Sequence, residues 1–132
     1  MNEIIHIDET NIVAFLKSGK GFLDTGKPFS RKIFLVSASV AGSYYVNGIH
    51  ELVEKIKVDT KLHFVREPDN KYDDLAILVK DQNNNKLGYV PREKNPILAR
   101  LMDAGKLIYG TVKTVNNDDS FINIEMEIFM DD

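Results

Sequence analysis

The sequence predicts a mostly β domain with two short helices, in which six strands form a small antiparallel barrel. Three observations predict this fold class. β-branched and aromatic residues occur in several short runs, turn-forming residues separate most of these runs, and only two segments after residue 30 have helical periodicity. The chain has 132 residues, of which 43% are hydrophobic, and this is enough for one core. We therefore expect one domain over residues 31–132, preceded by an appendage over residues 1–30.

The N-terminal appendage is expected to contain one short helix over residues 9–18. Its apolar side would carry Ile12, Val13, Phe15 and Leu16. Isolated helices shorter than about 12–15 residues are marginal in water, so this one should pack onto the main domain or onto a partner.

The main domain is predicted to begin with a strand over residues 31–42, which is rich in β-branched and aromatic residues. A helix should follow over residues 47–59, with Asn47 as its cap. The apolar positions of this helix have the spacing i, i+3, i+4, i+7: Ile49, Leu52, Val53 and Ile56.

Three strands are predicted next, over residues 61–67, 75–81 and 86–91. An Asp- and Asn-rich turn over residues 68–74 separates the first two. The Asn-rich segment 82–86 should form a hairpin turn between the second and third, because Asn tolerates left-handed backbone conformations.

A second helix is predicted over residues 95–105, with Pro96 at its first position and Gly105 at its C-terminal cap. Its core side is expected to contain Ile97, Leu98, Leu101 and Met102.

Two final strands, over residues 107–115 and 121–129, flank the turn 116–120. In the last strand Ile122, Ile124, Met126 and Ile128 alternate with polar residues, as in a strand with one buried face. Short strands joined mostly by turns are typical of small antiparallel barrels or partly open sheets, a group that includes OB-like folds.

Composition excludes several classes of function. The chain has no cysteine, so it can form neither a disulfide nor a thiolate metal site. It has no apolar run near twenty residues and no signal-peptide pattern at its start, so we expect a soluble, cytoplasmic protein. His6, His50 and His63 lack metal-ligand spacing, and no phosphate-binding loop or nucleophile motif is present. We expect no enzyme activity, no metal and no cofactor.

Charge is distributed unevenly along the chain, whose net charge is −3. Residues 31–114 hold fourteen Lys and Arg against ten Asp and Glu, whereas residues 115–132 hold six acids and no base. A modestly basic middle beside an acidic end suits a nucleic-acid binder that touches few phosphates. It also suits a solvated surface with no partner.

Three blocks of sequence combine aromatic, amide, acidic and basic residues at strand ends. They are VAGSYYVNGI at residues 40–49, REPDNKYDDLAI at residues 66–77 and LGYVPRE at residues 87–93. Together they resemble the HIRAN domain family, over about Ile33 to Ile128. This family includes accessory modules of DNA-remodelling helicases and standalone bacterial and phage proteins. The resemblance implies an OB-like β-barrel and, as in the best-understood members, recognition of the 3′-hydroxyl end of single-stranded DNA.

Tyr44 and Tyr72 match aromatic positions of the family, where the ring at Tyr44 would stack on a terminal base. An exposed aromatic ring offers about 1–3 kcal/mol per stacked base. Tyr45 should point to the opposite face of its strand, so we expect one residue of the pair Tyr44 and Tyr45 to lie in the core. The alternative for Tyr44 is an ordinary half-buried tyrosine of the barrel.

Asp73 falls where the family's carboxylate accepts a hydrogen bond from the 3′-hydroxyl. A carboxylate repels phosphate, so it would favour a strand end over internal DNA. The alternative is that Asp73 caps a turn, and Asn70 could serve either purpose.

The basic candidates for phosphate contacts are Arg66 and Arg92, with Lys94 and Lys71 as weaker ones. Two further positions of the site depart from some members. Ser43 stands where members that bind DNA ends can carry arginine, and Tyr89 stands where some carry histidine. The missing arginine removes one contact to phosphate or base.

The leading hypothesis is therefore a non-enzymatic module that binds the 3′ end of single-stranded DNA, alone or beside a helicase or another DNA-processing protein. The rival is a protein-interaction module that docks a partner enzyme through the N-terminal helix or the acidic terminal strand, with Phe15 or Phe129 as anchors. A metal-dependent nuclease lacks a ligand set.

Overall fold

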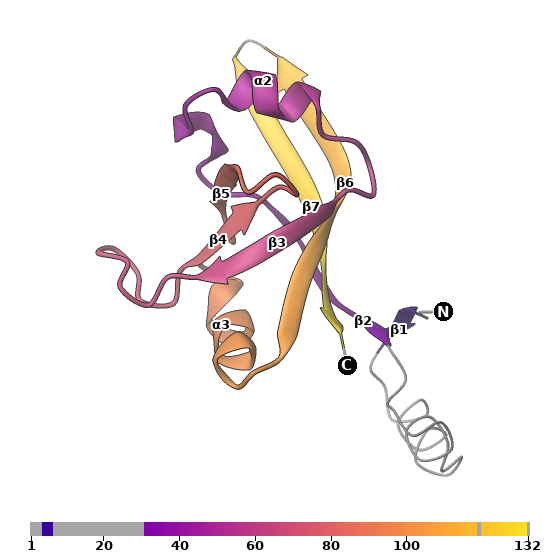
Figure 1. Cartoon of the computed structure of the whole chain (residues 1–132), viewed down its shortest axis with the longest axis vertical. Coiled ribbons are helices and arrows are strands. Elements are labelled where there is room, and N and C mark those ends of the chain that lie inside the picture. The colour runs from indigo at the N-terminus through magenta and orange to yellow at the C-terminus, as the bar shows by residue number, and fades with distance from the viewer. Residues whose placement is uncertain (1–3, 7–30, 119, 132) are drawn as a thin grey trace.

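A computed structural model describes residues 4–6, 31–118 and 120–131 (Figure 1). The helix expected over residues 9–18, and Phe15 with it, lies outside the described residues. The strands are β1 (Ile4–His6), β2 (Lys32–Ser39), β3 (Lys61–Arg66), β4 (Ile77–Lys80), β5 (Lys86–Tyr89), β6 (Leu107–Asp118) and β7 (Phe121–Asp131). The helices are α2 (Ile49–Glu54), α3 (Asn95–Asp103) and the short 3-10 helix η1 (Ser43–Tyr45).

The strands form one curled sheet in the order β1-β2-β7-β6-β3-β4-β5. Strands β2 to β7 pair with one another in antiparallel fashion, as predicted, and form a half-barrel that is accompanied by two α-helices. The described part of the appendage adds the three-residue strand β1, which pairs in parallel with β2 and was not predicted. The mostly β, OB-like fold class is therefore confirmed.

The segment that follows β2 contacts the end of β5, and this contact joins the two sides of the half-barrel. Ala41 and Tyr89 exchange both backbone hydrogen bonds, with N···O distances of 2.7 and 2.8 Å. Gly88 permits this approach, because a Cβ atom at Gly88 would lie 2.4 Å from the carbonyl oxygen of Ala41. The contact places η1 next to β5, on the left of Figure 1.

The core lies on the concave side of the sheet. Ile124, Met126 and Ile128 of β7 are fully buried there, as their alternation predicted, and they pack with Leu62 and Ile77. β-bulges interrupt the register of β2 and of β6, and bulges increase the local twist that a curled sheet needs. The last hairpin is tighter than predicted, since pairing extends to Asp118 and Phe121.

Helix α2 lies beside the β6–β7 hairpin (Figure 1), where His50 Nδ1 lies 2.9 Å from Asn117 Oδ1. The prediction of Asn47 as its cap is wrong by one residue. The N-cap is Gly48, whose φ of 75° is left-handed.

Helix α3 begins at Asn95, so Pro96 takes its second position and not the predicted first one. Gly105 follows the C-terminal cap in a left-handed conformation with φ of 92°. Gly105 N–H donates to Met102, and Lys106 N–H donates to Leu101, which is the Schellman pattern of a helix end.

The prediction that Ile97 belongs to the core side of α3 is wrong, since Ile97 is 72% exposed. Leu101 packs against the core, as predicted. The inward stripe also contains Asn95, Leu98, Ala99 and Met102. These residues have the i, i+3, i+4, i+7 spacing, but a polar residue occupies the first position. Leu98, Leu101 and Met102 of the predicted core side therefore do pack on the core, and Asn95 and Ala99 replace Ile97.

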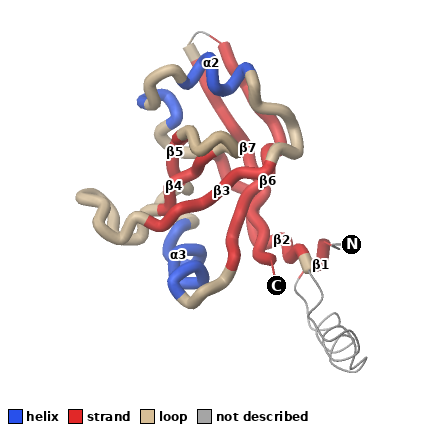
Figure 2. Tube along the Cα trace, viewed as in Figure 1, coloured by secondary structure: helices blue, strands red, loops and turns tan. Residues whose placement is uncertain are grey.

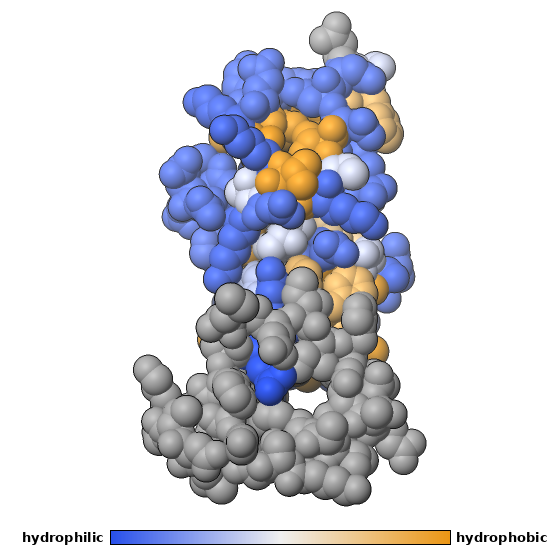
Figure 3. All heavy atoms as spheres, turned by 90° about the vertical axis from the view of Figure 1, so that its right-hand side faces the viewer, coloured by the Kyte–Doolittle hydropathy of each residue, from blue (hydrophilic) through white to orange (hydrophobic). Residues whose placement is uncertain are grey.

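The side of the molecule on the right of Figure 1 shows an apolar patch bordered by hydrophilic residues (Figure 3). The long loop between β3 and β4 projects on the left (Figure 2). No helix in the described part of the chain is long and apolar enough to cross a bilayer.

Candidate functional site

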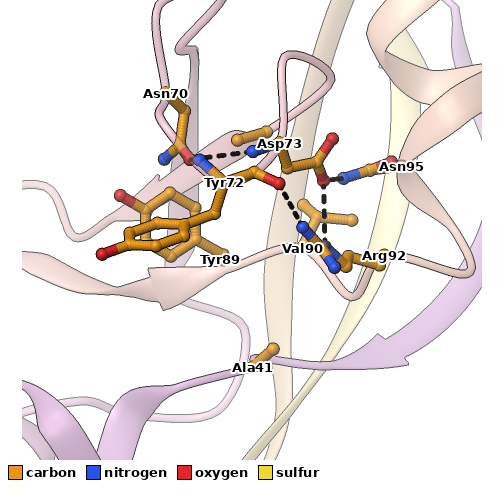
Figure 4. A pocket seen from close by; sticks show the side chains of 9 residues that line it. Ala41, Asn70, Tyr72, Asp73, Tyr89, Val90, Arg92 and Asn95 are labelled. Carbon is orange, nitrogen blue, oxygen red and sulfur yellow. Dashed lines mark hydrogen bonds and ion pairs between the residues drawn. The ribbon is translucent and has the colours of Figure 1, made fainter.

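A pocket of about 390 Å³ opens between the β3–β4 loop, the end of β5 and the start of α3 (Figure 4). Its lining residues are Ala41, Asn70, Tyr72, Asp73, Ala76, Tyr89, Val90, Arg92 and Asn95. The lining combines residues from all three of the sequence blocks described above. The closure of the half-barrel brings them together, because Ala41 and Tyr89 form the contact that joins β2 to β5.

Asn70 organises the loop that forms one wall of the pocket. Its Oδ1 accepts hydrogen bonds from the backbone N–H groups of Tyr72 and Asp73, at 2.9 and 3.1 Å. Its Nδ2 donates to Glu67 Oε1 at 3.0 Å. Such a side chain replaces a backbone turn, so Asn70 fixes the direction in which the next residues leave the loop.

Glu67 joins this loop to β5. Its Oε1 also accepts the hydroxyl hydrogen of Tyr89, at 2.7 Å. Burial acts to raise the pKa of Glu67, but the hydrogen bonds from Asn70 and Tyr89 outweigh it and lower that pKa. Burial and the bond to Glu67 raise the pKa of Tyr89. At neutral pH the Glu67 carboxylate is therefore ionised and the Tyr89 phenol is neutral, and their hydrogen bond fixes Tyr89 in the pocket wall.

Asp73 presents its carboxylate at the pocket, with a side chain that is 19% exposed. Its Oδ1 accepts the N–H of Leu75 at 3.0 Å, and its Oδ2 accepts Nδ2 of Asn95 at 2.8 Å. Arg92 Nε lies 3.6 Å from Oδ2. The Asn95 and Leu75 hydrogen bonds, assisted by the positive charges of Arg92 and Arg66, lower the pKa of Asp73.

Arg92 and Arg66 differ sharply in their surroundings. The Arg92 side chain is 69% exposed at the pocket, where it also donates to the Tyr72 carbonyl oxygen. The Arg66 side chain is only 13% exposed and does not line the pocket. It binds both carboxylate oxygens of Asp103, at 2.9 and 3.1 Å, and the carbonyl oxygens of Asp74 and Ala76. Arg66 thus ties the β3–β4 loop to α3.

The recognised blocks hold three exposed tyrosines, of which only Tyr72 lines the pocket. Tyr72 is 84% exposed on the loop, and Tyr44 and Tyr45 are 66% and 87% exposed on η1, with their rings edge to face at 5.8 Å. The prediction that one of Tyr44 and Tyr45 lies in the core is wrong. They occupy a 3-10 helix, in which successive side chains turn by about a third of a circle and do not alternate between two faces.

The remaining candidates lie around the pocket without lining it. Ser43 is buried, and its Oγ has no hydrogen-bond partner. Lys94 is half-buried at the N-cap of α3, and Lys71 is exposed on the loop. Lys86 places its Nζ 4.8 Å from the centre of the Tyr89 ring, which adds a positive charge to that wall.

Sequence reasoning missed Glu67 and Asn95. Both lie in or beside the recognised blocks, but their partners are 22 residues away in each case. A polar residue in the core stripe of α3 was the available signal for Asn95. Within the described ranges, no three His, Asp or Glu side chains are grouped closely enough to hold a metal ion.

The fold and the pocket define a class of protein: OB-like β half-barrels with a polar, aromatic-flanked pocket beside the β3–β4 loop. A sequence model of the HIRAN domain matches residues 33–131, and the chain belongs to the HIRAN domain family.

Solved structures of other proteins share this fold. A protein from Lactobacillus plantarum is 31% identical, with a TM-score of 0.71 over 76% of this chain and 96% of that one. The human HLTF HIRAN domain is 22% identical, with a TM-score of 0.60 over 75% and 78% of the two chains. The same human domain in its DNA-bound conformation is 24% identical, with a TM-score of 0.52 over 74% and 78%. A search of curated proteins found no match.

Proposed function

We propose that this chain is a DNA-binding module that captures the 3′-hydroxyl end of single-stranded DNA in the pocket and acts by binding rather than by catalysis. The observation that carries the proposal is the ionised carboxylate of Asp73, which lines the pocket between the exposed Tyr72 ring and the exposed Arg92 side chain. The DNA-bound conformation of the human HLTF HIRAN domain supports the choice of ligand.

The three side chains supply complementary interactions. Tyr72, and Tyr44 on the neighbouring η1, offer ring faces on which unpaired bases stack without regard to sequence. Arg92 offers a guanidinium group for a backbone phosphate. The Asp73 carboxylate accepts a hydrogen bond from a hydroxyl and repels phosphate, so it favours a strand that ends at this point.

Arg66 has no direct part in this proposal, because its donors already serve Asp103, Asp74 and Ala76. Its role is to hold the loop that carries Asp73. Asn70 and Tyr89 act in the same way, through Glu67, and they also line the pocket.

The test is a fluorescence-anisotropy titration with three forms of one oligonucleotide: a free 3′-hydroxyl, a 3′-phosphate and a closed circle. We expect the 3′-hydroxyl form to bind tightest and the circle to bind weakest. Equal binding of all three would contradict end recognition. Failure of all three would favour the protein-interaction rival. In that rival Phe129 is unsuitable as an anchor, because it is 3% exposed and packs on Phe34 and Tyr109.

A further inference from the structure

Asn95 is a buried polar residue in the core stripe of α3. It is 2% exposed, and its side chain points at the adjacent Asp73 (Figure 4), with 2.8 Å between Nδ2 and Oδ2. Burying an amide group costs free energy unless a hydrogen bond compensates it, and the carboxylate of Asp73 provides that bond. An apolar residue here would continue the stripe formed by Leu98, Ala99 and Met102. The helix thus carries an amide where packing alone would favour an alkyl group.

The hydrogen bonds of Asp73 divide its carboxylate into used and free acceptor positions. An ionised carboxylate has about four lone-pair positions. One on Oδ1 is taken by Leu75 N–H, and one on Oδ2 by Asn95. The Leu75 bond, from the same loop, is to Oδ1, and the Asn95 bond, from α3, is to Oδ2. Together they fix the plane of the Asp73 carboxylate.

Two arginine side chains attract the Asp73 carboxylate. Arg92 Nε, from the segment after β5, lies 3.6 Å from Oδ2, and Arg66, from the end of β3, contributes a weaker attraction. Asp74 follows in the chain, and its backbone carbonyl is held by Arg66. Arg92 and Asp73 therefore already form an ion pair through one carboxylate oxygen. Without the Asn95 anchor, the Asp73 side chain could rotate into a closer pair that uses both oxygens, and both groups would then be lost to a ligand.

We propose that Asn95 is a positioning residue that sets ligand specificity: it confines the ion pair between Asp73 and Arg92 to Oδ2, so that Oδ1 keeps an acceptor position for a hydroxyl donor and the guanidinium keeps N–H groups for phosphate. This inference rests on the proposed function. Asn95 of α3 lies outside the three recognised blocks. Through its bond to Asp73, it would determine how well the pocket distinguishes a 3′-hydroxyl from a 3′-phosphate.

The first test compares the binding ratio of 3′-hydroxyl to 3′-phosphate oligonucleotide in the wild type and in Asn95→Ala. Loss of a hydrogen bond to a charged group corresponds to about a tenfold change, so the ratio should fall by about that factor. Ile97→Ala is the matched control, because Ile97 lies on the same helix but is 72% exposed. Its ratio should equal that of the wild type.

The second variant, Asn95→Asp, keeps the shape of the side chain and therefore preserves packing if Asn95→Ala fails to fold. At pH 8 two adjacent carboxylates repel each other, and the ratio should be low. Near pH 5 the pair would share one proton, because adjacent carboxyl groups titrate as a unit. The introduced carboxyl then donates to Asp73, and the ratio should recover. The wild-type ratio should not rise over this interval.

A third measurement does not require DNA. An NMR titration of the Asp73 side-chain carbon should give a higher pKa in Asn95→Ala than in the wild type, because the strongest hydrogen bond to the carboxylate is gone. An unchanged binding ratio together with an unchanged Asp73 titration would overturn the inference. If the wild type itself fails to distinguish the two oligonucleotides, the proposed function has failed instead.

Discussion

The hydroxyl group of Tyr89 donates a 2.7 Å hydrogen bond to Glu67 Oε1 and so fastens the end of β5 to the β3–β4 loop. The same oxygen accepts Nδ2 of Asn70, whose Oδ1 shapes the turn that carries Tyr72 and Asp73. The half-buried carboxylate of Glu67 thus connects the strand that closes the half-barrel to the loop that forms the pocket.

Tyr89→Phe removes this connection and leaves the ring in place. We expect the free energy of unfolding to fall by about 1.5–3 kcal/mol, the usual range for a hydrogen bond to a charged group. Urea denaturation measures the change. Tyr45→Phe is the matched control, because the Tyr45 side chain is 87% exposed and should cost almost nothing. Equal stability of the two variants would mean that the Tyr89–Glu67 bond does not stabilise the loop.

Replacing either arginine with glutamine should separate a structural role from a binding role. Arg66→Gln breaks the paired hydrogen bonds to Asp103 and the bonds to the carbonyl oxygens of Asp74 and Ala76, and it should lower the free energy of unfolding more than Arg92→Gln does. Arg92→Gln should change stability little, since the side chain is 69% exposed. It should instead weaken DNA binding and reduce the slope of log affinity against log salt by about 0.7, the value for one phosphate of a single strand. An unchanged slope in Arg92→Gln would exclude Arg92 as a phosphate contact.

Gly88→Ala should destabilise the closure of the half-barrel. The added Cβ atom would lie 2.4 Å from the Ala41 carbonyl oxygen and 2.7 Å from Val40 Cγ1, at a φ of 150° that L residues rarely adopt. We expect a loss of about 3 kcal/mol or more, because backbone strain and steric overlap add. Gly105→Ala tests the strain alone, since nothing lies within 4 Å of its Cβ position, and it should cost about 1–2 kcal/mol. A smaller loss for Gly88→Ala than for Gly105→Ala would contradict the close approach.

The pH dependence of stability should include a contribution from Asp73. Its pKa in the folded chain is lower than its ordinary value of 3.8, so the unfolded chain binds a proton first as the pH falls. The stabilisation is therefore complete above about pH 5 and is lost as the pH falls through the folded-state pKa. Thermal melts between pH 3 and pH 7 should show a smaller acid-dependent decrease in Tm for Asp73→Asn than for the wild type. Parallel curves for both proteins would contradict this contribution.

Much of the fold was predictable because its signals are local. The alternation in β7 and the Pro96 and Gly105 boundaries of α3 depend on residues within one element. The errors occur where local patterns compete. Tyr44 and Tyr45 were predicted to lie in a strand because tyrosine favours strands. Instead they lie in a 3-10 helix, between Gly42 and Gly48, which both have a left-handed conformation.

The candidate site was predictable only in part, and for a physical reason. The position of Asp73 followed from the resemblance to HIRAN domains, whereas the partners that hold it come from distant elements. The Asn95 bond spans 22 residues and the Arg66–Asp103 pair spans 37. Such contacts depend on how the sheet curls, which no spacing within a block encodes. The sequence therefore predicted Arg66 as a phosphate contact, whereas in the fold its N–H groups donate to Asp103 and to the carbonyl oxygens of Asp74 and Ala76.

The most direct measurement of the central claim is a double-mutant cycle between Asp73 and the 3′-hydroxyl itself. The wild type and Asp73→Asn are each titrated with an oligonucleotide that ends in a 3′-hydroxyl and with one that ends in a 3′-deoxy sugar. We expect the wild type to prefer the hydroxyl by about tenfold, as for a charge-assisted hydrogen bond, and Asp73→Asn to lose most of that preference. The same preference in both proteins would show that Asp73 does not recognise the strand end.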